Sequence, residues 1–366
     1  MNSRERLTKV LSGELPDRVP ISTYELCGYN SRSFENQEPS YQRLMDFIRQ
    51  NTDSITMWTP PSSQPWEELQ TTSTWDENEY HIQKTILHTP KGDLTVTVKY
   101  TDTIKTLWRT EHLCKSVEDV DAWLSLPDIP LTYDASDYRR VVSELGDHGI
   151  VMASLKDPIC VAMELMEFGE ATVWALTEPD HFKATLEEIH RRNMRNIKNM
   201  LDTCPVDLYR ICGPEYATPP YLSPKHFESY VYPYLCDMVD LIHSYGKKVR
   251  IHSHGRIGQV LDMILDTGTD AIDPCEAPPD GDISLKDVKK KAAGRAVVFG
   301  NLQLKLLENA SEQEVREQVR VCMDSAKENG GYVIMPTAAP INIPLSSKTE
   351  RNYFAFIEEA LNLGKY

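Results

Sequence analysis

The sequence predicts a (β/α)8 barrel, a closed parallel sheet of eight strands surrounded by helices. From about residue 148 onward, short apolar runs alternate with longer amphipathic segments, which is the pattern of strand and helix units around a parallel sheet. Two further apolar runs near the start of the chain bring the number of predicted strands to eight. No strand is followed by a glycine-rich dinucleotide fingerprint, since GRIG (255–258) lacks the full spacing, and this disfavours an open doubly wound sheet.

The predicted elements follow one another along the chain. The strands are RVPISTYE (18–25), DSITMW (53–58), GIVMASL (149–155), VDLYRIC (206–212), KVRIHSH (248–254), DAIDP (270–274), AVVFG (296–300) and YVIMP (332–336). Helical patterns lie at about 179–203, 224–245, 256–266, 285–293, 311–329 and 347–363. Capping residues support several ends: Ser223 precedes Pro224, Glu314 follows Ser311 in a capping box, and Gly246 follows a helical segment.

The connection between the second and third strands, about 60–147, is enlarged and has a different character. Two alternating segments, YHIQKTILH (80–88) and DLTVTVKY (93–100), flank turn residues at 90–92 and predict an antiparallel hairpin. Two positions for the hairpin stay open: a lid over the barrel mouth, or a hairpin packed on the flank of the barrel. We therefore expect residues 1–366 to form a single barrel domain that carries this insertion.

Composition excludes several classes of partner. The 366 residues include 39 lysines and arginines against 55 acidic residues, a formal net charge of −16, so binding to a phosphate backbone lacks its electrostatic driving force. No apolar run approaches the roughly 20 residues that span a bilayer, and the first residues are charged where a signal peptide is apolar. The eight cysteines include no CxxC pair. We expect a soluble, cytoplasmic protein with reduced thiols and no nucleic-acid or membrane partner.

Polar residues at the carboxyl ends of the strands predict the active site, because the loops there vary on a rigid barrel. His252 and His254 end the fifth strand, and alternation places both side chains on one side of it. Two neighbouring imidazoles and the carboxylate of Glu276 on the next strand suit a metal site with two histidines and one carboxylate. Two alternatives stay open: the histidines bind carboxylates or an anionic substrate without metal, or Glu215 and Glu276 form an acid/base pair.

Other strand ends supply further candidates for the site. Glu215 and Tyr216 follow the fourth strand, and Asn301 follows the seventh; these three are the candidate catalytic residues. The candidate substrate-binding residues stand after the first, third and eighth strands: Glu25, Lys156, Asp157 and Thr337.

Several segments resemble the uroporphyrinogen decarboxylase superfamily, which also contains cobalamin-dependent methyltransferases such as methylcobalamin:coenzyme M methyltransferase. The resembling segments are RERLTKVLSGELPDRVP (4–20), GPEYATPPYLSPKHFESYVYPYL (213–235), GKKVRIHSHGRIGQVLDMILDTGTDAIDPCE (246–276), GDISLKDVKKKAAGRAVVFGNLQ (281–303) and GGYVIMPTAAPINIP (330–344). They occur in the family's order over nearly the whole chain. The barrel is the fold that this resemblance implies.

The resemblance is nearer to the methyltransferase branch than to true uroporphyrinogen decarboxylases. The decarboxylases use a pair of arginines after the first strand and an aspartate after the second. Here the first loop, YELCGYNSRSFENQ, contains a single arginine, Arg32. The loop after the second strand, MWTPPSSQ, contains no aspartate.

The thiol-directed methyltransferases carry a His-x-Cys zinc motif at the fifth strand and another cysteine after the eighth. The matching positions are His252, His254 and Ala338 or Ala339, so both thiolates are missing. Imidazole in place of thiolate leaves zinc more Lewis-acidic, which suits oxygen or nitrogen substrates.

The resemblance implies an enzyme that moves a methyl group between a small O- or N-methyl compound, or a thiol, and a corrinoid on a separate partner protein. Zinc held by His252, His254 and Glu276 would polarise the heteroatom. Homodimers are common in the superfamily, so the resemblance allows a homodimer, and the oligomeric state stays open.

Two other functions stay open at this point. One is a decarboxylase acting on a tetrapyrrole or another carboxylate substrate, for which Arg32, Lys156 and Arg256 are a sparse set of cations. The other is a non-catalytic tetrapyrrole- or corrinoid-binding module, in which the paired histidines ligate the central metal of the cofactor.

Overall fold

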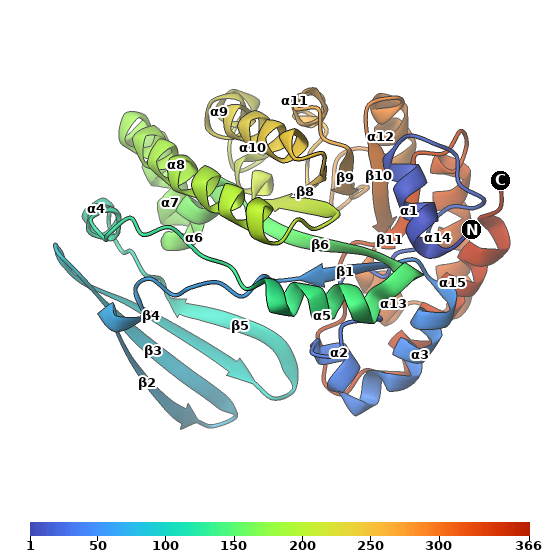
Figure 1. The fold of residues 1–366 in the computed structure, drawn as a ribbon, viewed down its shortest axis with the longest axis horizontal. Coiled ribbons are helices and arrows are strands. Elements are labelled where there is room, and N and C mark those ends of the chain that lie inside the picture. Colours follow the sequence, from blue (N-terminus) through green and yellow to red (C-terminus); the bar gives the residue numbers. More distant parts are fainter.

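The predicted barrel is confirmed in a computed structural model that describes residues 1–366. Seven parallel strands form one curled sheet in the order β1-β6-β7-β8-β9-β10-β11, with helices on its outer side (Figure 1). The strands are β1 Ser54–Trp58, β6 Gly149–Lys156, β7 Leu208–Cys212, β8 Lys248–Ser253, β9 Ala271–Pro274, β10 Val297–Leu302 and β11 Tyr332–Pro336. Each matches one of the strands predicted from the apolar runs.

An irregular segment takes the place of the first predicted strand, 18–25. Ile21 forms an isolated parallel bridge with Ile334 of β11, and its carbonyl accepts a 2.8 Å hydrogen bond from the Asp53 N–H just before β1. The segment therefore lies between β11 and β1 and closes the barrel. The prediction of a regular strand was wrong because Pro20 has no N–H to donate and Tyr24 adopts a positive φ of 58°.

The α-helices surround the barrel and fill the connections between strands. They are α1 Ser3–Leu11, α2 Phe34–Gln37, α3 Gln42–Asn51, α4 Val117–Leu124, α5 Ala135–Leu145, α6 Pro158–Leu165, α7 Phe168–Thr177, α8 Pro179–Thr203, α9 Pro224–Tyr230, α10 Tyr232–Ser244, α11 Leu261–Asp266, α12 Leu285–Ala292, α13 Leu304–Asn309, α14 Glu312–Ala326 and α15 Ser347–Leu363. None combines the length and apolar character that a membrane span needs.

Two helices differ from their predicted extents. The predicted helix over 224–245 is divided into α9 and α10, because Pro233 has no N–H to continue the helical hydrogen bonds. The predicted helix over 256–266 begins only at Leu261, since the Gly258 N–H instead donates to Asp282 Oδ1 at 2.8 Å.

The barrel interior changes from apolar to polar along the strands. Buried apolar side chains near the amino ends of the strands form one cluster, which includes Ile55, Ile150, Leu208, Ala271, Val297 and Val333. The outer faces of the strands pack against the helices in a larger apolar cluster. Because the amino-terminal half of the barrel is filled with apolar side chains, the polar chemistry is confined to the carboxyl ends.

The insertion is a four-stranded antiparallel sheet rather than the hairpin alone. The predicted hairpin is β3 Tyr80–Thr89 with β4 Gly92–Thr101, and β2 Gln70–Glu77 and β5 Ile104–Glu111 add a strand on each side. The sheet projects from the side where the barrel strands end (Figure 1). It is attached there by hydrogen bonds from Ile343 N to Thr103 O and from Arg109 Nη1 to Glu164 O.

Candidate active site

Two histidines mark the carboxyl end of β8. His252 is in register with Cys212 of β7 and with Asp273 of β9, and its side chain is buried. The ring centroids of His252 and His254 are 4.6 Å apart and the rings are nearly perpendicular. The two imidazoles are therefore neighbours, as the alternation of side chains along a strand predicts.

A carboxylate lies behind each imidazole. His252 Nδ1 is 2.9 Å from Asp273 Oδ2, and His254 Nδ1 is 3.3 Å from Glu276 Oε2. The Glu276 carboxylate also accepts a 2.8 Å hydrogen bond from the Gly255 N–H, which holds it in place. Because the Nδ1 atoms are engaged by carboxylates, the Nε2 atom of each ring is left for a ligand or a proton.

These contacts shift the acidity of the groups. Burial lowers the pKa of His254, but the contact with Glu276 outweighs burial and raises it above its ordinary value. Burial raises the pKa of Glu276, but the hydrogen bonds from His254 and from the Gly255 N–H outweigh burial, so its pKa is lowered overall. Burial also raises the pKa of Asp273, whereas Arg250 and His252 together hold it well below its usual range. The arrangement favours a protonated His254 paired with an ionised Glu276.

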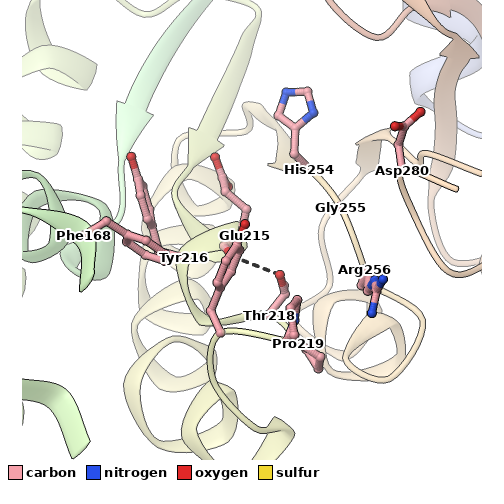
Figure 2. Close-up of a pocket in the computed structure, with 11 residues that line it drawn as sticks. Phe168, Glu215, Tyr216, Thr218, Pro219, His254, Gly255, Arg256 and Asp280 are labelled. Atoms are coloured by element: carbon pink, nitrogen blue, oxygen red, sulfur yellow. Dashed lines mark hydrogen bonds between the residues drawn. The ribbon is translucent and has the colours of Figure 1, made fainter. Parts of the chain in front are cut away.

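A cleft of about 490 Å³ opens beside His254. Its lining includes Glu215 and Tyr216 from the short 3-10 helix Pro214–Ala217, together with His254 and Arg256 from the loop after β8. Figure 2 shows His254 on one side of the cleft and the rings of Tyr216 and Phe168 on the other. An aromatic wall that faces an imidazole and a carboxylate suits a small organic substrate with one polar end.

The predicted zinc ligands do not form a three-ligand site in this structure. No group of three or more His, Cys, Asp or Glu side chains is arranged to hold one ion. His252 and His254 supply two imidazole donors, but Glu276 lies against the Nδ1 atom of His254, where it orients the ring. The donor set is therefore one short of a catalytic zinc site, and zinc stays a prediction.

Three predicted site residues are buried and engaged in the fold. Asn301 in β10 donates from Nδ2 to the Cys275 carbonyl at 2.8 Å. Thr337, just after β11, accepts a 3.2 Å hydrogen bond from the Leu304 N–H. Asp157 is the N-cap of α6 and accepts from the Cys160 N–H at 2.8 Å. Each of them supports a strand end or a helix beside the cleft rather than lining it.

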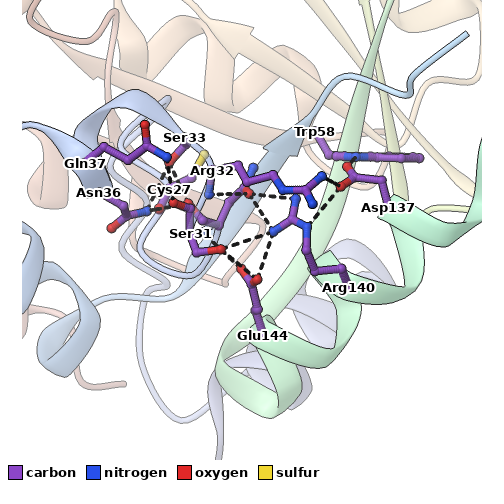
Figure 3. Close-up of polar contacts among 11 residues, drawn as sticks. Cys27, Ser31, Arg32, Ser33, Asn36, Gln37, Trp58, Asp137, Arg140 and Glu144 are labelled. Atoms are coloured by element: carbon purple, nitrogen blue, oxygen red, sulfur yellow. Dashed lines mark hydrogen bonds and ion pairs between the residues drawn. The ribbon is translucent and has the colours of Figure 1, made fainter.

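The remaining predicted residues are more exposed. Lys156 forms a surface ion pair with Glu164, and Glu25 is half-exposed above the barrel interior. Arg32 lies in a surface cluster between the first loop and α5, where it pairs with Asp137 at 2.6 Å (Figure 3). Arg32 is therefore committed to an ion pair outside the cleft.

Two arginines in the barrel interior were missed from the sequence. Arg210 of β7 and Arg250 of β8 are register partners, and both are buried. The alternation that pairs His252 with His254 also places Arg250 on the same face, and the same rule aligns Arg210 with Cys212. This alternation could have revealed both arginines, although each lies inside an apolar run that predicts a buried strand.

Comparison with known proteins identifies the architecture. The model of the uroporphyrinogen decarboxylase (URO-D) family matches residues 84–352. A methyltransferase from Methanosarcina mazei has a TM-score of 0.62 and 14% sequence identity, covering 99% of this chain and 99% of that chain. A D-psicose 3-epimerase with D-tagatose from Clostridium cellulolyticum H10 has a TM-score of 0.35 and 8% identity, covering 63% of this chain and 84% of that chain. No curated protein matches the sequence significantly.

Proposed function

The chain belongs to the uroporphyrinogen decarboxylase family, and within it we propose an enzyme that transfers a methyl group from a small O- or N-methyl compound to a corrinoid on a separate protein. The observation that carries the proposal is the pair His254 and Glu276 beside the aromatic cleft. The full-length likeness to a methyltransferase of the same fold supports the choice of reaction.

In the proposed reaction His254 acts as a general acid. Breaking the bond between the methyl carbon and the heteroatom leaves the electron pair on oxygen or nitrogen, which needs a proton. The contact with Glu276 raises the pKa of His254 above its ordinary value despite burial, which favours the protonated form that a general acid requires. His254 Nε2 gives this proton to the departing heteroatom, and a Co(I) corrinoid on the partner protein would supply the electron pair for the new bond to the methyl carbon.

The other residues of the cleft orient the substrate. Tyr216 and Phe168 supply an aromatic wall, with ring centroids 5.7 Å apart. The carboxylate of Glu215 lines the same cleft and is the group available to bind a polar substituent or a positively charged nitrogen. His252, which is buried and does not line the cleft, is held by Asp273 next to His254.

A decarboxylase acting on a small carboxylate is the second candidate. The observation that favours it is the pair of buried arginines, Arg210 and Arg250, because a carboxylate substrate requires cationic groups. Release of carbon dioxide from a carboxylate substrate, without methyl transfer, distinguishes this reaction.

The proposal is tested by methyl transfer to free cob(I)alamin, followed by the absorbance of methylcobalamin, with methyl ethers and methylamines as donors. We expect His254→Gln to lower the rate by about 100-fold or more, as the loss of a general acid does. His88→Gln is the matched control, because His88 also contacts a carboxylate, Asp93, but lies on the exposed sheet. Unchanged turnover in His254→Gln would refute the role of His254.

Metal content of the same proteins, measured by mass spectrometry, tests the zinc prediction. About one zinc per chain that is lost in both His252→Ala and His254→Ala would make the imidazoles ligands. Binding of cobalamin without turnover of any donor would instead support a non-catalytic corrinoid-binding module.

A further inference from the structure

The barrel interior holds two guanidinium groups side by side. Arg210 and Arg250 face each other in register on adjacent strands, below His252. Asp273 is the buried carboxylate among them, with its Oδ1 atom 3.0 Å from Arg250 Nε and its Oδ2 atom 2.9 Å from His252. Asp273 therefore balances Arg250, and Arg210 is left without a buried anion of its own.

The partners of Arg210 are mostly neutral. Its Nε donates to Ser154 Oγ at 3.1 Å and its Nη1 donates to the Tyr24 hydroxyl at 3.0 Å. Its Nη2 makes no hydrogen bond, and the nearest acidic oxygen, Glu25 Oε1, is 3.7 Å away. The Arg210 side chain is only 8% exposed, and its Nη2 atom is the donor that has no hydrogen-bond partner. The long contact with a half-exposed carboxylate compensates this buried charge only weakly, so the Nη2 edge of the guanidinium favours an anionic ligand.

The surroundings of this edge are partly exposed to solvent. Ser154 lies on the inner face of β6, in register with Arg210, and it is exposed. Glu25, whose Oε1 atom is 3.7 Å from Arg210 Nη2, has 42% of its side chain exposed. The exposed groups around Arg210 are therefore Ser154 and Glu25, and the carboxyl ends of the same strands carry the histidines.

We propose that the substrate carries a carboxylate and that Arg210 binds it through the free Nη2 edge, with the Tyr24 hydroxyl beside it. This assignment rests on the proposed function and names its substrate class. Glu25 is the counter-ion that the substrate carboxylate replaces. The reacting end of the substrate then lies higher in the barrel, beside His252 and His254, and its body lies along the aromatic wall.

Isothermal titration of the full chain with benzoate and with its neutral isostere benzamide tests the assignment. The two molecules have nearly the same size and shape, but benzamide is neutral and carries an NH2 donor in place of one carboxylate oxygen. We expect benzoate to bind at least about tenfold more tightly than benzamide, because charge-assisted bonds to arginine are the stronger ones. Arg210→Gln should remove this difference by weakening benzoate about tenfold while leaving benzamide unchanged.

Two further variants keep the proposal testable if Arg210→Gln does not fold. Glu25→Gln changes a half-exposed side chain and removes the competing carboxylate, so benzoate affinity should rise by about twofold to fivefold, the range for a partly exposed ion pair. Arg32→Gln removes the same charge from the surface cluster and should change neither affinity. Circular dichroism confirms that each variant is folded.

Equal affinity for benzoate and benzamide, or no detectable benzoate binding, would overturn the assignment. So would a folded Arg210→Gln protein that retains full benzoate affinity, or a Glu25→Gln protein with no gain. Arg210-dependent benzoate binding in a protein that transfers no methyl group would overturn the proposed function alone. Methyl transfer with no preference for benzoate would overturn only the assignment of Arg210.

Discussion

The carboxylate of Asp273 contacts two basic side chains in the barrel interior: its Oδ2 atom is 2.9 Å from His252 Nδ1, and its Oδ1 atom is 3.0 Å from Arg250 Nε. One fully buried carboxylate therefore orients the imidazole and neutralises the guanidinium. This shared position links the stability of the barrel to the geometry of the candidate active site.

Asp273→Asn is expected to lower the free energy of unfolding by about 3–5 kcal/mol, because it leaves Arg250 as a buried charge without an anion. Urea denaturation measures the change. Asp93→Asn is the control, since Asp93 also contacts a histidine, at 2.7 Å, but the pair is exposed on the inserted sheet. The control should change stability by less than about 1 kcal/mol. Equal effects of the two substitutions would show that burial of the Asp273 pair is unimportant.

Asp157→Asn is expected to change the pH dependence of stability. Burial raises the pKa of the Asp157 carboxyl well above its ordinary value, and its Oδ2 atom has no hydrogen-bond partner. The folded protein therefore retains a proton that the unfolded chain releases above pH about 4. Stability from this group is complete below that pH and is lost as the pH rises toward the folded pKa.

The asparagine side chain is neutral at every pH, so the variant does not lose this contribution to stability as the pH rises. Its stability relative to the wild type should increase between pH 4 and pH 8, as measured by urea denaturation at several pH values. A constant difference across this range would mean that Asp157 is ionised in the folded protein.

Asn301→Ala is expected to lower the free energy of unfolding by about 1–3 kcal/mol, because the buried Cys275 carbonyl loses the hydrogen bond from Asn301 Nδ2. Asn309→Ala removes a bond of the same kind and length, 2.8 Å to the Lys305 carbonyl, at an exposed helix end. That control should change stability by less than about 1 kcal/mol, because water replaces the lost bond. A loss no larger than in the control would exclude a structural role for the Asn301 amide.

Much of the fold could be predicted because buried parallel strands are apolar runs. AVVFG and YVIMP are recognisable without any contact information, and they became β10 and β11. The strand β2, QTTSTWDE, could not be found in this way, since every one of its residues is exposed and its sequence is polar. Its position depends on pairing with β3, which is a property of the sheet and not of the segment.

The candidate site could be predicted only where its residues are close in sequence. His252 and His254 share a strand end, so alternation alone brings them together. Arg210 bonds to Tyr24, 186 residues away, and this contact follows from closure of the barrel. Asp157 was expected at the substrate because it ends a strand, but its carboxyl group caps the next helix instead.

Gly213→Ala is expected to be among the most damaging substitutions near the site. Gly213 has a φ of 127°, and an added Cβ would lie 2.1 Å from Asp157 Oδ1 and 2.4 Å from Cys160 Cβ. Backbone strain of about 1–3 kcal/mol then adds to about 1–3 kcal/mol of overpacking. Gly92→Ala separates the two effects, since Gly92 has a φ of 130° and nothing within 4 Å of the added Cβ. Urea denaturation should give a clearly larger loss for Gly213→Ala; equal losses would mean that the loop before Glu215 moves aside without cost.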